Sequence, residues 1–259
     1  MNNLFDLTGK TALITGGAGL LGKKHAEAIL EQGGTVILAD YNQESLREAV
    51  TELGDSVIPA YMDVNNKSAI EEALKDFKQI DILINNAAKD PKVKTTGGLS
   101  RETQFETMTE EFWHEGINTI LNGTFLCSQV VANKMLKTGG GVILNIASDL
   151  GVIAPDQRIY NRETPKPITY SAAKWGVIGM TKYLATYFAD RNIRVNSLCP
   201  AGVYVDQPDD FVERLANLIP MGRMAHVDEY KGAIIFLCSD ASSYMTGANI
   251  IIDGGRTVW

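Results

Sequence analysis

Tyr170 and Lys174 are the two residues whose types and spacing most directly suggest chemistry. Residues four apart on a helix lie on the same face, because the helix turns once per 3.6 residues. An ammonium group beside a phenol favours the phenolate, so we expect Lys174 to lower the pKa of Tyr170 towards neutrality. Such a tyrosine can act as a general acid or base. An ordinary surface pair has the same spacing, so the surrounding sequence must decide.

A glycine-rich turn, Thr15–Gly22 (TGGAGLLG), separates a short apolar run from a helical pattern. Glycines let a backbone approach a pyrophosphate closely, and a helix N-terminus offers free amide groups to an anion. The alternative is a turn that is glycine-rich only because it is tight. The residues that we expect to contact a dinucleotide here are Gly16, Gly19, Leu20, Leu21 and Gly22.

Asp40 ends the next apolar run, where the adenosine ribose of a dinucleotide would lie. A carboxylate there can accept both ribose hydroxyls and would repel a 2′-phosphate, which favours NAD over NADP. Lys23 and Lys24 are close enough in sequence to weaken this preference. Asp is also common at strand ends for the sake of turn geometry alone.

Apolar runs alternate with helical patterns along most of the chain, and the runs are apolar throughout. This alternation predicts an α/β Rossmann fold, doubly wound, in which helices flank a seven-stranded, mostly parallel sheet. The expected strands are Lys10–Thr15, Thr35–Asp40, Val57–Asp63, Asp81–Asn85, Gly141–Ala147, Ile193–Leu198 and Ala248–Ile252. The expected helices are Leu20–Glu31, Gln43–Leu53, Ser68–Phe77, Glu110–Leu136, Ile168–Ala189, Phe211–Leu218 and Asp228–Leu237.

Three polar stretches interrupt this alternation, at 89–107, 150–167 and 201–218, and we expect them to be substrate loops. There is no repeat, low-complexity tract or linker, so we expect one NAD(P)-binding domain over residues 1–259.

Composition excludes several classes of function. The formal charge is −7 and no basic stretch offsets it, which argues against nucleic acid. No apolar stretch approaches the length of a membrane span, and the first residues do not resemble a signal peptide. Three widely separated cysteines are typical of reduced thiols in a cytoplasmic protein. The three histidines are scattered too, so we expect no metal site.

Taken in chain order, these motifs resemble those of the short-chain dehydrogenases/reductases of the single-domain type, along nearly the whole chain. The matching motifs are the glycine turn, Asp63–Val64, Asn85–Ala88 (NNAA), Asn118, Ser148, Tyr170 with Lys174, Pro200 and Asp253–Gly255 (DGG).

The resemblance implies a role for each matching residue. Tyr170 would be the acid/base, and Lys174 would bind the nicotinamide ribose. Ser148 would hydrogen-bond the reacting oxygen, and Asn118 would position a water in a proton relay. Asn85 would brace the sheet beside the cofactor. Further cofactor contacts would come from Asp63 and Val64 at the adenine, and from Asn86, Ala87, Pro200 and the backbone of Val203.

Two of the chain's departures from the family pattern bear on its substrate. The glycine spacing resembles that of the extended branch, which often acts on nucleotide sugars. Ser148 and Tyr170 are farther apart than in typical relatives, and the excess is Ala154–Pro167. Gln157, Arg158 and Tyr160 in this insertion suit a hydroxylated or anionic substrate. A subunit contact or a surface excursion is the alternative.

The resulting prediction is a cytoplasmic, NAD-dependent oxidoreductase that interconverts a secondary alcohol and a ketone. Oxidation is the favoured direction. Family members with similar loops include enzymes of bacterial surface-polysaccharide and flagellin-glycan pathways, so the resemblance implies a sugar or sugar derivative as substrate. A sugar-nucleotide epimerase or dehydratase and a non-catalytic NAD(H)-binding regulator are the alternatives. The last helix, the last strand and the tail Thr257–Trp259 resemble a subunit interface, which predicts a homotetramer or homodimer.

Overall fold

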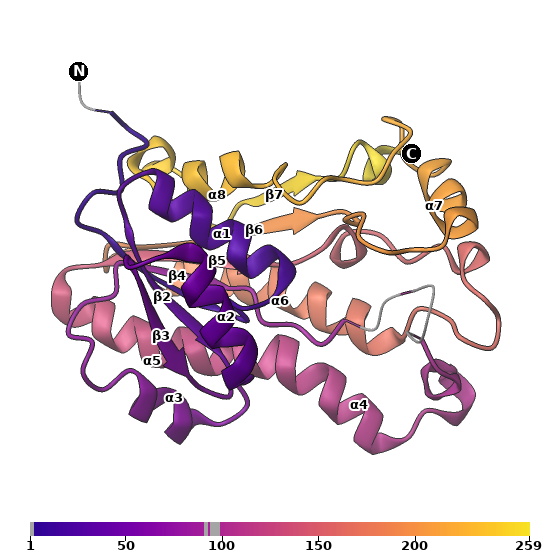
Figure 1. Cartoon of the computed structure of the whole chain (residues 1–259), viewed down its shortest axis with the longest axis horizontal. Helices are drawn as coiled ribbons and strands as arrows, with labels where there is room; N and C mark the ends of the chain where they lie inside the picture. Colours follow the sequence, from indigo (N-terminus) through magenta and orange to yellow (C-terminus); the bar gives the residue numbers. More distant parts are fainter. Residues whose placement is uncertain (1–2, 91–92, 94–98) are drawn as a thin grey trace.

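Seven parallel strands form the central sheet of the computed structural model, which describes residues 3–90, 93 and 99–259 (Figure 1). The strand order is β3-β2-β1-β4-β5-β6-β7, and every neighbouring pair is parallel. The predicted doubly wound Rossmann architecture is confirmed. The strands are β1 (Thr11–Thr15), β2 (Thr35–Asp40), β3 (Val57–Tyr61), β4 (Ile82–Asn85), β5 (Gly141–Ile146), β6 (Ile193–Pro200) and β7 (Asn249–Ile252).

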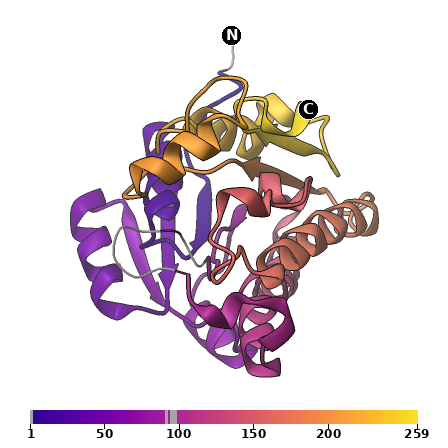
Figure 2. The same cartoon turned by 90° about the vertical axis from the view of Figure 1, so that its right-hand side faces the viewer.

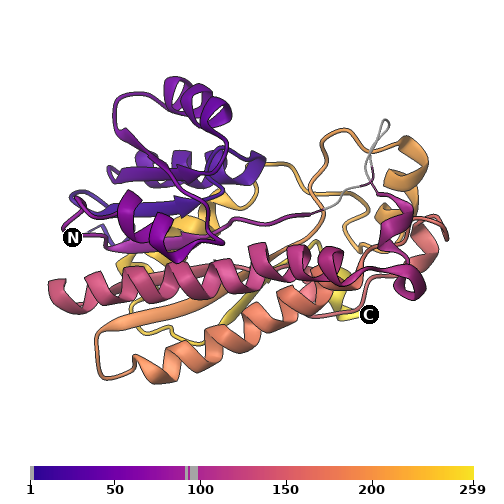
Figure 3. The same cartoon turned by 90° about the horizontal axis from the view of Figure 1, so that it is seen from below.

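Helices cover both faces of the sheet. One face carries α1, α2 and α8, and the other carries α3, α5 and α6. Seen from below, α4 and α5 run beside α6 (Figure 3). The helices are α1 (Leu20–Glu31), α2 (Gln43–Leu53), α3 (Lys67–Ala73), α4 (Glu110–Ile117), α5 (Gly123–Thr138), α6 (Ile168–Tyr187), α7 (Asp209–Ala216) and α8 (Lys231–Cys238).

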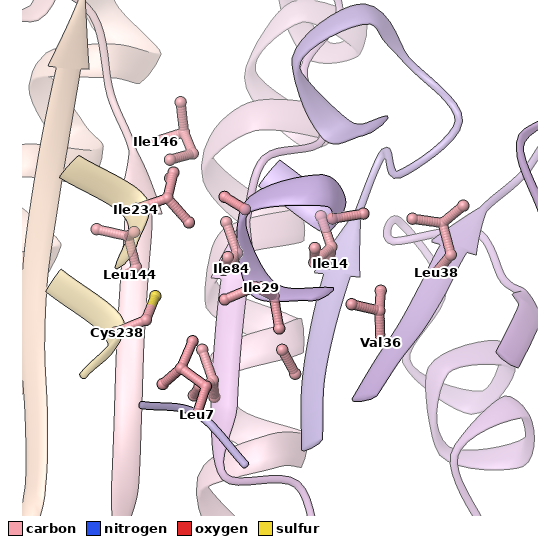
Figure 4. Close-up of a cluster of buried hydrophobic side chains, with 14 of the residues drawn as sticks. Leu7, Ile14, Ile29, Val36, Leu38, Ile84, Leu144, Ile146, Ile234 and Cys238 are labelled. Carbon is pink, nitrogen blue, oxygen red and sulfur yellow. The ribbon is translucent and has the colours of Figure 1, made fainter. Parts of the chain in front are cut away.

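Side chains of alternate strand residues enter two separate cores. On one face, Ile14 and Leu38 of the sheet belong to the same cluster as Ile29 of α1 and Ile234 of α8 (Figure 4). Their sequence neighbours point to the other face, because successive strand residues face opposite ways. Full burial of such a side chain contributes about 1.5–3 kcal/mol. Strands buried on both faces must be apolar throughout, which is why the sequence reveals them.

The expectation of a single helix over Glu110–Leu136 is wrong, because a π-helical turn, η3 (Asn118–Asn122), separates α4 from α5. The Asn122 side-chain amide donates to Asn118 Oδ1 across this turn. Gly123 follows at a tight contact, where a Cβ atom would lie 2.9 Å from Val64 Cγ2. Single π turns within helices often occur at functional sites.

Other elements differ from prediction mainly at their ends. β6 extends to Pro200 because Pro200 pairs with Ile252 of β7. Asn66 caps α3 by accepting from Ala69 N at 3.2 Å, and the helix ends at Ala73 rather than Phe77. α7 begins at Asp209, and α8 begins only at Lys231.

The three predicted loops follow strands β4, β5 and β6, at the end of the sheet that Figure 2 views. They contain short 3-10 turns, including η5 (Gln157–Ile159) in the second loop. The third loop contains the helix α7. Positions 91–92 and 94–98 of the first loop lie outside the described residues. Among the helices that are described, none has the length and apolarity needed to cross a membrane.

Candidate active site

A cavity of about 1000 Å³ opens at the carboxyl ends of the strands. Its lining includes the turn after β1 and the end of β4, the two neighbours between which the strand order reverses. Open α/β sheets bind their ligands at such a switch point. Residues from the glycine turn and Tyr170 line the same cavity.

Four of the five predicted glycine-turn contacts, Gly16, Gly19, Leu20 and Leu21, line this cavity. Gly16 has φ +60°, and a Cβ atom there would lie 2.8 Å from Ala87 Cα. The fifth, Gly22, does not line the cavity. A Cβ atom on it would lie 2.3 Å from the Gly16 carbonyl oxygen, so Gly22 lets the helix pack against the turn.

The N-terminus of α1 suits a pyrophosphate. Its N-cap residue, Gly19, has no side chain to occupy the first amide groups, and the first turn contains no acidic residue. Amides and the positive end of the helix dipole are therefore available to an anion.

Asp40 lies at the end of β2, where it accepts from Ala18 N at 3.2 Å and Asn42 N at 3.0 Å. Its neighbours in the cavity wall are Tyr41, Asn42 and Ser45, none of which is basic. Lys23 instead pairs with Glu52 at 2.6 Å, and Lys24 with Glu27 at 2.9 Å. Neither lysine is among the described residues of the cavity lining.

The other predicted cofactor residues also line the cavity: Asp63, Val64, Asn86, Ala87, Pro200 and Val203. Asn86 ties the end of β4 to the glycine turn, since its side-chain amide donates to Thr15 O and Gly16 O, both at 3.0 Å. Asn85 braces the sheet from behind, donating to Ser128 Oγ at 2.9 Å and Asn145 Oδ1 at 2.8 Å.

The structure brings the four predicted catalytic residues together, because Asn118, Ser148, Tyr170 and Lys174 all line this cavity. Tyr170 and Lys174 lie one turn apart on α6. Lys174 Nζ donates to Ile146 O at 2.6 Å and lies 5.7 Å from the centre of the Tyr170 ring. Ser148 follows β5 and accepts from Leu150 N at 3.1 Å.

The expectation that Lys174 lowers the pKa of Tyr170 is wrong. Burial raises the pKa of Tyr170 well above its ordinary value, the Asp90 carboxylate adds to the rise, and the Ser148 hydroxyl opposes it. Burial also lowers the pKa of Lys174 to about 8. Both groups lose water in this cavity, and that loss outweighs the attraction of an ammonium group directed at a backbone carbonyl.

A buried ion pair that the sequence did not reveal supports Ser148. The Ser148 hydroxyl donates to Asp149 Oδ1 at 2.8 Å, and Arg256 Nη1 donates to Asp149 Oδ2 at 2.9 Å. The side chains of Asp149 and Arg256 are only 3% and 5% exposed. Asp149 could have been suspected from the sequence, because it directly follows Ser148. Nothing in the sequence pointed to Arg256 as its partner, because 107 positions separate the two residues.

The insertion Ala154–Pro167 reaches the cavity through Tyr160 and Lys166. Lys166 was not anticipated from the sequence. It forms an ion pair with Asp90, a residue of the loop after β4, and its Nζ lies 4.1 Å from the centre of the Tyr170 ring. Tyr160 packs against Phe211 of α7 with ring centres 5.6 Å apart.

The two other substrate residues expected in this insertion, Gln157 and Arg158, do not line the cavity. Gln157 does not line the cavity, because its side chain bonds both the N–H and the carbonyl of Lys166 at 3.1 and 3.0 Å. Arg158 has a side chain that is 86% exposed and pairs with Asp156 at 2.6 Å. Both side chains are satisfied within the loop itself.

Comparison with known proteins gives matches over nearly the whole chain. A family model described as Enoyl-(Acyl carrier protein) reductase matches residues 17–257. The NAD-dependent glycerol dehydrogenase of Listeria innocua is 33% identical over 264 residues, covering 98% of this chain and 96% of that protein.

Two solved structures resemble the fold closely. A short-chain dehydrogenase from Leptospira borgpetersenii with bound NAD+ has a TM-score of 0.87 and 36% identity, covering 99% of this chain and 96% of that one. A gluconate 5-dehydrogenase from Burkholderia cenocepacia in complex with NADP and tartrate has a TM-score of 0.84 and 29% identity, covering 99% and 98%. On these matches, and on the motifs gathered in one cavity, the chain belongs to the short-chain dehydrogenase/reductase family, and its relatives support an oxidoreductase that acts on alcohols and ketones.

Proposed function

We propose that this protein is an NAD-dependent dehydrogenase that oxidises a secondary alcohol of a sugar, polyol or related derivative to the ketone, and catalyses the reverse reaction. The observation that carries the proposal is the placement of Asn118, Ser148, Tyr170 and Lys174 in the wall of one cavity that also contains the glycine turn.

The preference for NAD rests on Asp40. Its carboxylate lines the cavity, and the two lysines nearby in sequence are paired with Glu52 and Glu27 elsewhere. A 2′-phosphate at this position would meet a negative charge with no basic residue among the neighbouring wall residues to offset it. The relatives include NAD and NADP complexes, so this chain's own residues must carry the argument.

A bound nicotinamide supplies the acceptor or donor of the hydride. The residues of the chain manage the proton that remains. Tyr170 takes the proton from the substrate hydroxyl during oxidation and returns it to the carbonyl oxygen during reduction. Ser148 lines the same cavity, and its hydroxyl donates to Asp149 Oδ1, which fixes its rotamer. Lys174 would bind the nicotinamide ribose of a bound cofactor.

The proposed class of substrate follows from the wall beyond Tyr170. Tyr160 offers a hydroxyl there beside the Lys166–Asp90 ion pair, and Phe211 and Leu215 form an apolar side. A small molecule with several hydroxyl groups suits such a mixed surface. The names of two relatives, a glycerol dehydrogenase and a gluconate 5-dehydrogenase, support the same class.

A screen with purified protein and NAD+ tests the proposal. Glycerol, threitol, gluconate, hexoses and nucleotide sugars would be supplied in turn, and reduced nicotinamide would be followed by its absorbance. We expect NADH to form with one of the polyols or sugars, and to form more slowly or not at all with NADP+. Tyr170→Phe should abolish this turnover while NAD+ binding stays within a few-fold of the unaltered protein.

The same screen separates the alternatives. Product formation from a nucleotide sugar without net NADH would favour an epimerase or dehydratase. NAD+ binding without turnover of any alcohol would favour a non-catalytic regulator. Turnover that survives Tyr170→Phe would refute the acid/base assignment.

A homotetramer or homodimer is the proposed assembly. Val258 and Trp259 at the C-terminus are 78% and 75% exposed in the single chain, and a second subunit would cover such an apolar end. Light scattering on the purified protein, compared with a variant lacking Val258 and Trp259, would test this. The cytoplasm remains the proposed compartment, and Cys127, Cys199 and Cys238 are buried free thiols, as a reducing environment would leave them.

A further inference from the structure

The insertion Ala154–Pro167 brings a second ammonium group to Tyr170. Lys166 Nζ lies 4.1 Å from the centre of the Tyr170 ring, nearer than Lys174 Nζ at 5.7 Å. The Lys166 side chain is only 8% exposed, so little water screens it. A cation over the face of an aromatic ring is attracted to it, and the attraction grows when water is excluded.

The position of Lys166 is fixed by its own loop. The Gln157 side chain donates to Lys166 O at 3.0 Å and accepts from Lys166 N at 3.1 Å. These two hydrogen bonds join the 3-10 turn η5 to the residues that lead into α6, the helix that carries Tyr170. The backbone of Lys166 is therefore held while its side chain extends over the ring.

Asp90 provides the opposite charge. It lies in the loop after β4, its side chain is 25% exposed, and it forms an ion pair with Lys166 across the cavity wall. Tyr170 thus faces both members of one ion pair that joins two loops. The two charges act on a phenolate in opposite directions, because the ammonium attracts it and the carboxylate repels it.

We propose that the Lys166–Asp90 pair sets the protonation of Tyr170, with Lys166 favouring the phenolate and Asp90 favouring the phenol. The inference rests on the proposed acid/base function of Tyr170. Lys166 and Asp90 are positioning residues in this scheme, since they act through Tyr170. Because the insertion supplies Lys166, the pH dependence of this enzyme is set by residues outside the four that carry the reaction.

Other charged and titratable groups also surround Tyr170. Lys174 lies on the same helix, Ser148 and Asp149 follow β5, and Tyr160 lies in the insertion. Arg256 holds Asp149 in a buried pair. Burial raises the pKa of Tyr170, and among the charged groups Asp90 contributes most to the rise. Neither variant replaces any of these groups, so the two variants separate the effect of the Lys166–Asp90 pair from the effects of the other charges.

The test compares Lys166→Gln with Asp90→Asn. Each substitution breaks the same ion pair, so a purely structural role predicts effects of the same sign. An electrostatic role predicts opposite signs. The Tyr170 phenol should titrate at higher pH in Lys166→Gln and at lower pH in Asp90→Asn, with a change of about threefold to tenfold in the ionised fraction. The double variant should lie between the two.

Two readouts follow the titration. The first is the pH profile of kcat/KM for NAD+-dependent oxidation of glycerol, or of the alcohol that the screen finds. The second is the carbon NMR signal of tyrosine labelled at Cζ, in the NAD+-bound protein, with Tyr170 assigned by comparison with Tyr170→Phe. The second needs no turnover. If the screen finds no turnover but the NMR shifts of the two variants have opposite signs, the proposed function is overturned and the role of the ion pair stands.

Controls keep the inference falsifiable. Arg158→Gln lies in the same loop but outside the cavity lining, and should leave both readouts unchanged. Lys166→Arg retains the charge and should restore most of the Lys166→Gln shift. Shifts of equal sign in the two single variants, or no shift in folded protein, would overturn the inference. If Lys166→Gln does not fold, the direction of the shift in Asp90→Asn decides.

Discussion

Arg256 donates from Nη1 to Asp149 Oδ2 at 2.9 Å, which ties the C-terminal turn to the residue after Ser148. Asp253 fixes the turn that carries Arg256, because its carboxylate accepts from Gly255 N at 2.8 Å and Thr257 N at 2.7 Å. Both charges of the pair are buried, and Asp149 in turn accepts the Ser148 hydroxyl. The C-terminal turn is therefore part of the support of the active site.

Breaking this buried pair should be costly. Arg256→Met should lower the free energy of unfolding by about 3–5 kcal/mol, because it leaves the Asp149 carboxylate buried without its cation. Denaturant unfolding measures the change. Asp149→Asn combined with Arg256→Met removes both charges and should recover part of the loss. A single variant as stable as the unaltered protein would show that the pair contributes nothing.

His25 of α1 predicts a dependence of stability on pH. The side chain is fully buried, neither ring nitrogen has a partner among the described residues, and burial lowers its pKa from 6.5 to about 4. The unfolded chain therefore binds a proton below pH 6.5 that the folded chain binds only near pH 4. Stability should fall as the pH falls through this window, by up to about 3 kcal/mol.

Denaturant midpoints measured between pH 7 and pH 4, for the unaltered protein and for His25→Leu, test this dependence. Leu cannot take up a proton, so its curve should lack the contribution from this window. Parallel curves for the two proteins would assign the loss of stability to other groups.

Asp40 should set the cofactor preference. Asp40→Ala removes the charge that repels a 2′-phosphate, so the ratio of NAD+ to NADP+ affinity should narrow. Asp40→Asn is the closer control for structure, because its amide oxygen can still accept one of the two hydrogen bonds that Asp40 receives from Ala18 N and Asn42 N. Both variants should narrow the ratio in binding titrations. An unchanged ratio would mean that other residues determine the preference.

Two glycines should respond in opposite ways to a methyl group. Gly16 has φ +60° and a Cβ atom there would lie 2.8 Å from Ala87 Cα, so Gly16→Ala should destabilise the fold by at least about 1–2 kcal/mol and weaken NAD+ binding. Gly179 is exposed on α6 with no atom within 4 Å of a Cβ position. Gly179→Ala should stabilise the fold by about 0.5–1 kcal/mol and leave NAD+ binding unchanged. Thermal unfolding and binding titrations check both.

The places where the structure differs from the sequence-based expectation have a common cause. Gln157 and Arg158 have the right types for a substrate site, but each side chain finds a partner within its own loop. The break in the long helix at Asn118 follows from a local side-chain contact and from close packing at Gly123. Residue type shows what a side chain can do, whereas its direction depends on the backbone around it.

The sequence by itself determined the parallel sheet, the order of its elements and the four residues that meet in the cavity. The sheet follows because strands buried on both faces must be apolar. The four residues follow from the resemblance of their motifs to those of the family. Tertiary structure alone decided that Lys166 and Asp90 lie at Tyr170, that Arg256 lies at Asp149, and that Tyr170 is harder to ionise than its neighbour Lys174 suggested. These outcomes depend on burial and on distances through space, which the order of residues along the chain does not contain.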